Sequence, residues 1–407
     1  MWAYSLGIRF WEWLIRRAAA WHHGAAGRCS MLVQPWPEIT KGRDLIWFHC
    51  ASLGEYEQIL PAIQCWEARQ PEHQILISFY SVSGYRIVKP KENTRLVVGF
   101  PGDLKPELSQ FLSYFKPKLA VFTKAEIWPL CLNLLNQKGI PSMLVAFRPG
   151  RSKNLAHWHG RFVLNQMKLL ACISCQDEKD RTFLTQLGLQ QVFTDGDPRV
   201  ERTMELQLQP LKWPNHLRWI QNAPLIVLGS VWPADLDLWE PVISNRSDLN
   251  WILAPHQINL KLKGRIQKKF PNAQYWTSDS KTAASNIVVL DTVGVLSRLY
   301  RLADAAYVGG GFGRGIHSAL EPGAAGLSVA FGPRYTHSRE ALAFLELGVS
   351  KLLTNKKDAE VWLQEIENKT FRNRVKAKLQ NWFDMHTGTA QKIAKRMEGV
   401  LSSRTQV

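Results

Sequence analysis

Short apolar runs rich in β-branched residues recur along most of the chain, and each is followed by a longer stretch with helical periodicity. A continuous apolar run is typical of a strand buried on both faces of a parallel sheet. Repeated strand–helix units therefore predict doubly wound sheets. The strands expected in the first half lie at residues 45–48, 75–77, 95–98, 119–122, 143–146 and 171–173. Those expected in the second half lie at residues 225–228, 251–253, 287–290, 305–308 and 328–331.

The pattern restarts near Leu225, after a Pro-bearing stretch, and 407 residues are enough for two domains. We therefore expect an α/β protein with two Rossmann-like parallel-sheet domains facing a cleft, which is the GT-B plan. The expected parts are residues 1–41 as an amphipathic helix and lead-in, 42–208 as the first domain, 209–222 as a linker, 223–375 as the second domain and 376–407 as a C-terminal helix and tail.

The first segment is rich in tryptophan and arginine at helical spacing. Its charges argue against a secretory signal and against a bilayer span. Such a pattern predicts a helix that lies in a membrane interface, although a helix packed on its own protein is the alternative. The apolar side would carry Trp2, Leu6, Phe10, Trp13, Leu14 and Trp21, and the other side Ser5, Arg9, Glu12 and Arg16.

Lys and Arg number 51 against 34 Asp and Glu, so the formal net charge is +17. This excess favours a polyanionic partner, and nucleic acid, anionic lipid and phosphorylated glycolipid all fit. The six cysteines follow no disulfide-scaffold spacing, which favours a reducing compartment. Cys172 and Cys175 lack a second ligand pair for zinc and lie in an apolar run, so we expect buried thiols in a strand.

Glu55 is the first candidate for chemistry. It follows the expected strand at 45–48, beside Gly54, and a carboxylate at a strand end can take a proton from an attacking hydroxyl. The purely structural explanation is a capping box, because Ser52 and Glu55 have the Ser-x-x-Glu spacing at a helix start.

Glu126 follows the strand at 119–122 and predicts a second carboxylate in the same cleft, with a helix-start acid as the structural alternative. Arg148 and Arg199 are expected to close further strands. A guanidinium there can hold a sugar carboxylate or a departing phosphate, but a surface ion pair explains either arginine equally well.

A glycine-rich stretch at residues 309–315 joins an expected strand to an expected helix. Backbone amides freed by glycines such as Gly311, together with a helix N-terminus, make an anion site. The spacing fits neither a dinucleotide fingerprint nor a Walker loop, so a nucleotide with few phosphates fits better, with Glu321 accepting from ribose hydroxyls. A glycine-rich turn between packed elements is the alternative.

Further loops end strands at Ser230, at Pro255–His256 and at residues 291–294. Each is weak alone, and His256 could be a plain surface residue. In a parallel sheet all of them would meet at one rim.

Taken in order, seven motifs resemble the 3-deoxy-D-manno-octulosonic acid (Kdo) transferases, from about residue 44 to about residue 345. The motifs are Ala51-Ser52-Leu53-Gly54-Glu55, Glu126-Ile127-Trp128-Pro129, Gly196-Asp197-Pro198-Arg199, Gly229-Ser230, Pro255-His256, Asp291-Thr292-Val293-Gly294 and His317-Ser318-Ala319-Leu320-Glu321-Pro322. The resemblance implies an inverting glycosyltransferase that moves Kdo from CMP-Kdo to a lipid A precursor, with no metal or other cofactor and no nucleic-acid partner. It also implies association with an anionic membrane, at the cytoplasmic face of the inner membrane.

Carried over, the resemblance makes Glu55 the general base and Glu126 and Arg199 the pair that supports the transition state. The first domain would bind the acceptor and the second the CMP-sugar. Substrate or CMP contacts would come from Ser52, Gly54, Arg148, Ser230, Pro255, His256, Val293, Gly294, Val295, Gly311, Ser318, Ala319, Leu320 and Glu321.

The chain departs from the family pattern at three places. Ser318 stands where many members have Asn, Arg199 where they have Lys, and Phe147-Arg148-Pro149 lacks the usual Asn-x-Arg. The rival enzyme classes are a sugar-nucleotide epimerase and another lipid-linked glycosyltransferase. A basic nucleic-acid-binding protein is the non-enzymatic rival, but no helix-turn-helix, RNP-type pattern or clustered basic stripe supports it.

Overall fold

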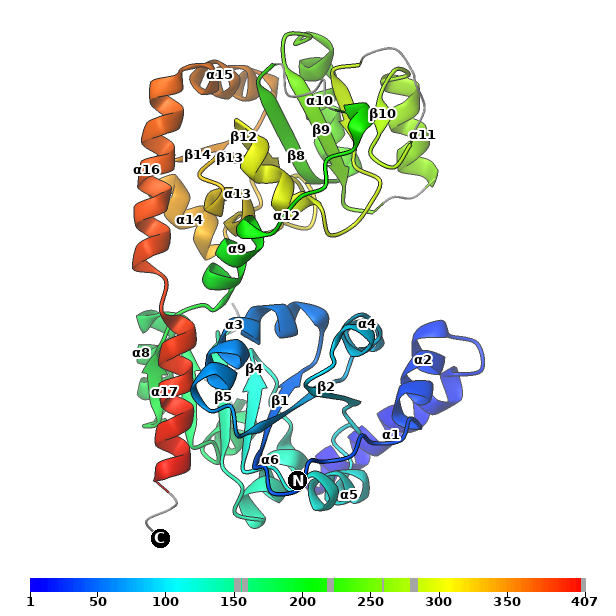
Figure 1. Ribbon diagram of the computed structural model, residues 1–407, viewed down its shortest axis with the longest axis vertical. Coiled ribbons are helices and arrows are strands. Elements are labelled where there is room, and N and C mark those ends of the chain that lie inside the picture. Colours follow the sequence, from blue (N-terminus) through cyan, green and yellow to red (C-terminus); the bar gives the residue numbers. More distant parts are fainter. Residues whose placement is uncertain (150–154, 156–159, 218–222, 258–259, 279–284, 404–407) are drawn as a thin grey trace. The chain divides into compact units, whose positions relative to one another are not determined.

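The computed structural model describes residues 1–149, 155, 160–217, 223–257, 260–278 and 285–403 (Figure 1). It has two compact units, residues 1–202 with 387–407 and residues 203–386. The chain passes from the first unit to the second within α9 (Arg199–Leu208) and returns after α16 (Lys369–Met385). Residues 218–222 of the expected linker and 404–407 of the expected tail lie outside the described residues.

The first unit is built on a parallel sheet of seven strands in the order β3-β2-β1-β4-β5-β6-β7. The strands are β1 (Leu45–Cys50), β2 (Gln74–Phe79), β3 (Leu96–Gly99), β4 (Leu119–Thr123), β5 (Ser142–Phe147), β6 (Cys172–Cys175) and β7 (Val192–Thr194). The helices are α1 (Trp2–Ala18), α2 (His23–Leu32), α3 (Leu53–Arg69), α4 (Val82–Val88), α5 (Lys105–Phe115), α6 (Pro129–Gln137), α7 (Gly160–Met167), α8 (Glu178–Gln186) and α17 (Thr389–Ser402).

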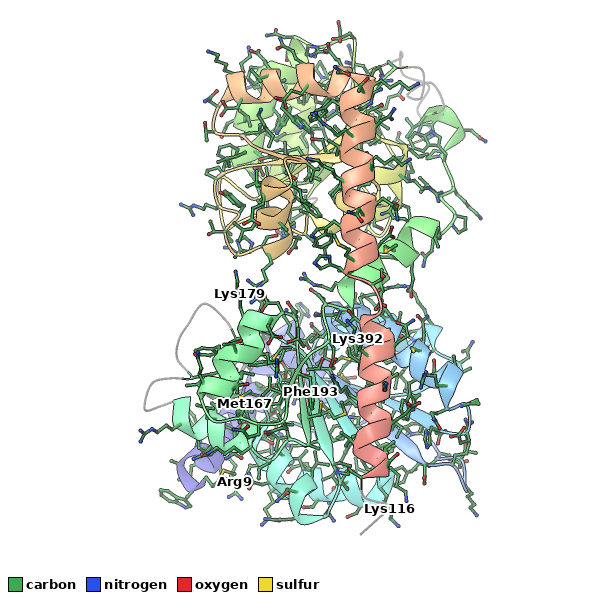
Figure 2. The ribbon with its side chains drawn as sticks, turned by 90° about the vertical axis from the view of Figure 1, so that its left-hand side faces the viewer. Arg9, Lys116, Met167, Lys179, Phe193 and Lys392 are labelled. Carbon is green, nitrogen blue, oxygen red and sulfur yellow. The ribbon has the colours of Figure 1, made fainter. Side chains whose placement is uncertain are left out.

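Helices cover both faces of this sheet, as its continuously apolar strands require. Ile46 and Phe48 of β1 pack on one face with α3 and α17, whereas Trp47, between them, packs on the other with α5 and α6. The Arg396 guanidinium of α17 lies 3.8 Å from the ring centre of Phe193 in β7. Figure 2 labels Phe193, and it labels Lys392 on α17. The C-terminal helix is therefore part of the first unit.

The second unit repeats the plan with the strand order β10-β11-β9-β8-β12-β13-β14, again all parallel. Its strands are β8 (Leu225–Val231), β9 (Asn250–Pro255), β10 (Gln274–Tyr275), β11 (Ile287–Val289), β12 (Ala305–Val308), β13 (Ser328–Phe331) and β14 (Ser350–Leu352). Its helices, besides α16, are α10 (Pro233–Ser244), α11 (Leu260–Lys269), α12 (Leu296–Leu299), α13 (Leu320–Ala324), α14 (Arg339–Glu346) and α15 (Lys356–Glu367).

All eleven expected strands are present, and the expected pair of doubly wound parallel sheets is confirmed. Cys172 and Cys175 are buried in β6 as free thiols, as expected. The strands missed from the sequence are β7, β10 and β14, and each lies at the edge of its sheet. Edge strands are short and only partly covered, so they lack the long apolar run that marks a central strand.

The N-terminal helix α1 is attached to the first unit through its polar side. Glu12 and Arg28 of α2 form a buried ion pair at 3.0 Å, and the Tyr4 hydroxyl donates to Asp103 at 2.8 Å. The aromatic side is exposed, with Trp2 at 79%, Phe10 at 61% and Trp13 at 49%. This is the reverse of a helix that packs its apolar face on its own protein. No helix among the described residues is long and apolar enough to cross a membrane.

Candidate active site

Glu55 lies at the carboxyl end of β1, in the first turn of α3. The expected capping box is present: Ser52 Oγ accepts from the Glu55 amide at 3.4 Å, and the Ser52 amide donates to Glu55 Oε2 at 3.2 Å. These bonds use only part of a carboxylate, which offers about four lone-pair sites. Glu55 therefore fixes its own helix start and keeps acceptor capacity for a second task.

The surroundings of Glu55 make it a stronger base than an ordinary glutamate. Burial raises its pKa, and the nearby Glu126 carboxylate raises the pKa further, while backbone amides and Lys124 act in the opposite direction. A pKa nearer neutrality suits a general base that works near neutral pH. The structure thus brings together the two carboxylates expected from the sequence.

Glu126 lies in the turn between β4 and α6, where Lys124 adopts a left-handed conformation at φ 66°. Helix α6 begins only at Pro129, so Glu126 is not in its first turn and the helix-dipole explanation of this residue is wrong. Its carboxylate oxygen Oε2 lies 3.8 Å from Nε2 of His49, which is buried at the end of β1.

His49 is a site residue that the sequence did not single out. Its Nδ1 is 2.8 Å from Ser78 Oγ, and that oxygen also accepts from the Trp47 indole N–H at 2.8 Å. The Ser78 hydroxyl hydrogen is then free to donate to Nδ1, which puts the ring hydrogen on Nε2, facing Glu126. Nε2 has no hydrogen-bond partner in the described part of the chain, and burial lowers the pKa of His49. The signal was a histidine in an otherwise apolar buried strand.

Arg199 does not close a strand, contrary to expectation, because it opens α9 after a loop that follows β7. Its guanidinium donates to Asp197 Oδ2 at 2.8 and 2.6 Å, and Gln58 of α3 donates to Asp197 Oδ1 at 3.0 Å. Gln58 lies three residues after Glu55, on the same side of α3. Arg199 is thus held beside the helix that carries Glu55. Arg148 directly follows β5, as expected.

In the second unit, loops after β8, β9 and β12 bring three rings together. Trp232 stacks on His256 with ring centres 4.5 Å apart, and His256 lies 4.4 Å from His317. The Trp232 indole nitrogen is 3.3 Å from His317 Nε2. His256 is exposed, and its ring is nevertheless part of this cluster. Burial, with His256 and His337 nearby, lowers the pKa of His317.

The glycine-rich stretch is explained in part by packing. A Cβ on Gly309 would lie 2.4 Å from the Ser230 carbonyl oxygen, and one on Gly311 would lie 2.6 Å from Gly332. These glycines let loops from β8, β12 and β13 approach closely, which is what the alternative of a glycine-rich turn between packed elements predicts. The helix that follows, α13, is a single short turn, which weakens the expected anion site at its N-terminus.

Asp235 holds this loop in place and was also missed from the sequence. It is buried in the first turn of α10 and accepts from the Gly310 amide at 2.9 Å, the Tyr307 hydroxyl at 2.6 Å and the Trp232 amide at 2.8 Å. Burial raises its pKa. One side chain therefore connects the glycine-rich loop to the loop that carries Trp232.

Glu321 lies at the start of α13, and burial raises its pKa to about 6. Burial raises the pKa of Tyr300, and Glu321 raises it further, so the two side chains are neighbours. The Tyr300 hydroxyl lies against Gly229, next to Ser230. Ser318 Oγ accepts from the Leu320 amide at 3.2 Å, and Ala319 and Leu320 are buried. The expected CMP contacts at residues 293–295 lie in the loop before α12. Val293 is exposed, Gly294 has a left-handed φ of 77°, and Val295 directly precedes α12. Pro255 ends β9.

The family model described as "3-Deoxy-D-manno-octulosonic-acid transferase (kdotransferase)" matches residues 26–202. A 3-deoxy-D-manno-octulosonic acid transferase of Chlamydophila psittaci is 28% identical over 313 residues, 73% of this chain and 71% of that protein. The enzyme of that name from Aquifex aeolicus is 26% identical over 77% of this chain and 82% of its own. The expected resemblance to the Kdo transferases is therefore confirmed, over about three quarters of the chain.

Solved structures agree on the fold of this chain. A UDP-GlcNAc 2-epimerase from Neisseria meningitidis matches with a TM-score of 0.62 at 11% identity, covering 89% of this chain and all of that one. The calicheamicin glycosyltransferase CalG4 matches with a TM-score of 0.53 at 12% identity, covering 88% and 99%. At such identities the similarity shows the fold alone, and it confirms the GT-B class.

Proposed function

We propose that the protein is a Kdo transferase, which moves Kdo from CMP-Kdo to a lipid A precursor, lipid IVA, with inversion at the anomeric carbon. The observation that carries the proposal is the pair formed by Glu55 and Glu126 at the ends of adjacent strands β1 and β4, one with a raised pKa and the other facing His49. Two carboxylates placed in this way fit a general base and a group that stabilises the transition state better than they fit a purely structural role.

In the proposed reaction, Glu55 removes the proton from a primary hydroxyl of the glucosamine disaccharide. The oxygen attacks the anomeric carbon of Kdo while the bond to the CMP phosphate breaks, so the configuration inverts. Glu126, oriented by the Nε2–H of His49, and Arg199, held by Asp197, support the charges that develop. The CMP contacts come from the cluster around His256 and from the residues at 293–295 and 318–321.

The proposed reaction is tested by incubating the protein with CMP-Kdo, generated in place, and a tetra-acylated lipid A precursor. Mass analysis of the lipid should show the addition of Kdo, and NMR of the product should show the inverted anomeric configuration. Release of free Kdo with an unchanged lipid would contradict the proposed acceptor.

The α1 helix supports association of the protein with a membrane, and we propose that this membrane surface is the cytoplasmic face of the inner membrane. Its indole and phenyl groups are exposed while Arg16 and Arg17 lie in its last turn, the arrangement of a helix that inserts aromatics at headgroup depth and attracts anionic lipid.

Replacing Trp2, Phe10 and Trp13 by serine should weaken binding to anionic vesicles at least about tenfold, because each buried aromatic contributes about 1.5–3 kcal/mol. Vesicle sedimentation measures the loss. Met385→Ser, which removes an exposed apolar side chain (66%) from the second unit, is the matched control and should bind as wild type. Equal binding by the triple variant would exclude α1 as the attachment site.

Because of the raised pKa of Glu321, we expect nucleoside binding to weaken as the pH falls. Its pKa of about 6 means that it is an anionic acceptor for ribose hydroxyls above that pH and loses this capacity below it. The dissociation constant of cytidine, which has no phosphate to titrate, should therefore rise between about pH 7 and about pH 5. Calorimetry on wild type and Glu321→Gln measures it. A variant that keeps the wild-type pH dependence would assign the effect to another group.

A further inference from the structure

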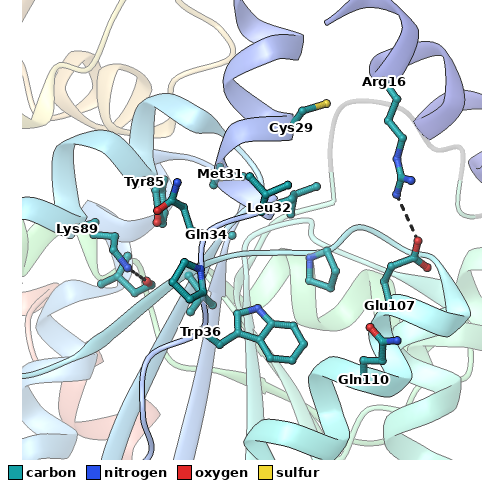
Figure 3. A pocket seen from close by; sticks show the side chains of 16 residues that line it. Arg16, Cys29, Met31, Leu32, Gln34, Trp36, Tyr85, Lys89, Glu107 and Gln110 are labelled. Atoms are coloured by element: carbon teal, nitrogen blue, oxygen red, sulfur yellow. Dashed lines mark hydrogen bonds and ion pairs between the residues drawn. The ribbon is translucent and has the colours of Figure 1, made fainter.

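A cavity of about 370 Å³ lies in the first unit, apart from the strand ends that carry Glu55 and Glu126 (Figure 3). It is enclosed by α2, the segment that follows α2, α4, the edge strand β3 and α5. Its volume falls within the range of small-ligand sites.

One part of the cavity lining is apolar: Met31, Tyr85 and Val98 are buried there, and Val33 is strongly exposed at its margin. The polar lining residues are Gln34, Glu107 and Gln110, with Arg16 and Lys89. The apolar part offers few hydrogen bonds to sugar hydroxyls, whose burial without partners is costly. This part therefore suits an aliphatic chain better than a sugar ring.

Two cations border this apolar space. Arg16 of α1 reaches across to Glu107 of α5 at 3.3 Å (Figure 3). Lys89 donates to the Val97 carbonyl at 3.0 Å and lies 5.4 Å from the centre of the Tyr85 ring. No carboxylate in the described part of the chain forms an ion pair with Lys89, so its charge is available to an anionic group at the cavity.

The cavity also borders α1. Arg16 of this helix lines it, and Trp13, three residues earlier, is one of the exposed aromatics. A lipid that lies beside α1 would thus have a cation and an apolar cavity within reach.

We propose that this cavity binds one fatty acyl chain of an anionic lipid, with the headgroup charge beside Lys89. The proposal rests on the membrane attachment proposed above. The lipid is either the acylated acceptor or a bulk phospholipid, which share this chemistry. Bound there, the chain would hold the first unit at the bilayer surface independently of the insertion of α1.

Two cysteines of the chain itself report on the cavity, so no label has to be attached for the test. Cys29 lines the cavity and is partly exposed, whereas Cys65 of α3 is also partly exposed but lies outside it. Alkylation by N-ethylmaleimide is followed at both thiols by mass spectrometry. The probe is a single-chain lysophosphatidic acid below its micelle concentration, so that no bilayer can cover α2.

The lysophosphatidic acid should slow alkylation of Cys29 at least about tenfold at saturation and leave Cys65 within about twofold. Glycerol 3-phosphate, the headgroup alone, should protect neither thiol. Leu32→Trp, which fills the cavity, should abolish the protection, and Lys89→Met should raise the half-protecting concentration several-fold, both with a wild-type circular dichroism spectrum. Unprotected Cys29 in the wild type, or equal protection in Leu32→Trp, would overturn the proposal.

The source of the chain is distinguished by repeating the experiment with the tetra-acylated acceptor in detergent. Protection of Cys29 by the acceptor alone assigns the cavity to the acceptor, and protection by both lipids assigns it to lipids in general. Sugar transfer to the same acceptor without protection of Cys29 by either lipid would overturn the cavity proposal and leave the proposed reaction standing. Protection of Cys29 without sugar transfer would support the cavity proposal and contradict the proposed reaction.

Discussion

Replacement of Glu55 by glutamine should lower turnover by about 10²–10⁴-fold, the usual contribution of a general base, while the protein stays as stable as the wild type. Glutamine can occupy the same position of a capping box and accept from the Ser52 amide, so the start of α3 is preserved. It cannot take a proton from a hydroxyl. Initial rates of Kdo transfer and thermal unfolding measure the two effects.

Ser52→Ala is the matched control, because it removes the other half of the capping box. Losing the bond to the Glu55 amide should lower the free energy of unfolding by about 1 kcal/mol. If Glu55 served only to cap its helix, Glu55→Gln would keep its activity and Ser52→Ala would show the larger defect. Normal turnover in Glu55→Gln would remove this residue from the mechanism.

The pH dependence of transfer should carry the signature of Glu55. A base acts in its ionised form, and the pKa of Glu55 is raised by burial and by Glu126, so turnover should begin to fall at a higher pH than for an ordinary glutamate. Glu126→Gln removes the neighbouring negative charge, which lowers the pKa of Glu55 and should move this acidic limb to lower pH. Profiles of kcat for both proteins test it, and an unmoved limb would mean that Glu126 does not act on the base.

The sequence predicted what depends on long apolar runs and on motifs read in order. The central strands of both sheets are continuous buried runs, and they were found, whereas the edge strands β7, β10 and β14 were not. The residues Glu55, Glu126 and His256 were found because each follows such a run, and a parallel sheet brings the residues after its strands to one edge.

What the sequence could not show is which side chains support those residues. His49 turns its Nε2–H toward Glu126 because Ser78, on the neighbouring strand β2, fixes its tautomer, and this pairing depends on strand register. Asp235 reaches Gly310 across 75 positions of the chain. Contacts between distant segments leave no local periodicity, so they become visible only once the fold is known.

The N-terminal helix α1 is a second case in which the sequence alone did not show what a side chain contacts. The helical spacing of its aromatic residues predicted an apolar side opposite a polar one, and those aromatics are exposed. Glu12, however, was placed on a polar side without a partner, and the structure buries it against Arg28 of α2. The helix is thus held by its charged side, which the sequence alone would assign to solvent.

The buried pair of Glu12 and Arg28 should therefore govern the docking of α1. Their side chains are only 4% and 5% exposed, and Arg28 also donates to the carbonyl of Tyr80 at 3.2 Å and stacks over its ring at 3.8 Å. Gly102, at φ 89°, makes room for the carboxylate, because a Cβ there would lie 2.6 Å from Glu12 Oε1. A buried charge that loses its partner is far more costly than a pair replaced by apolar groups.

Arg28→Met should accordingly destabilise the docking of α1 by about 3–5 kcal/mol, because it leaves the Glu12 carboxylate buried without its cation. The double variant Glu12→Leu with Arg28→Met removes both charges and should recover much of that loss. Hydrogen exchange of the α1 amides, read beside those of the β1 core, separates release of the helix from global unfolding, since local opening leaves core protection unchanged. A double variant as damaged as the single one would show that the pair contributes packing and hydrogen bonds to Tyr80 rather than charge compensation.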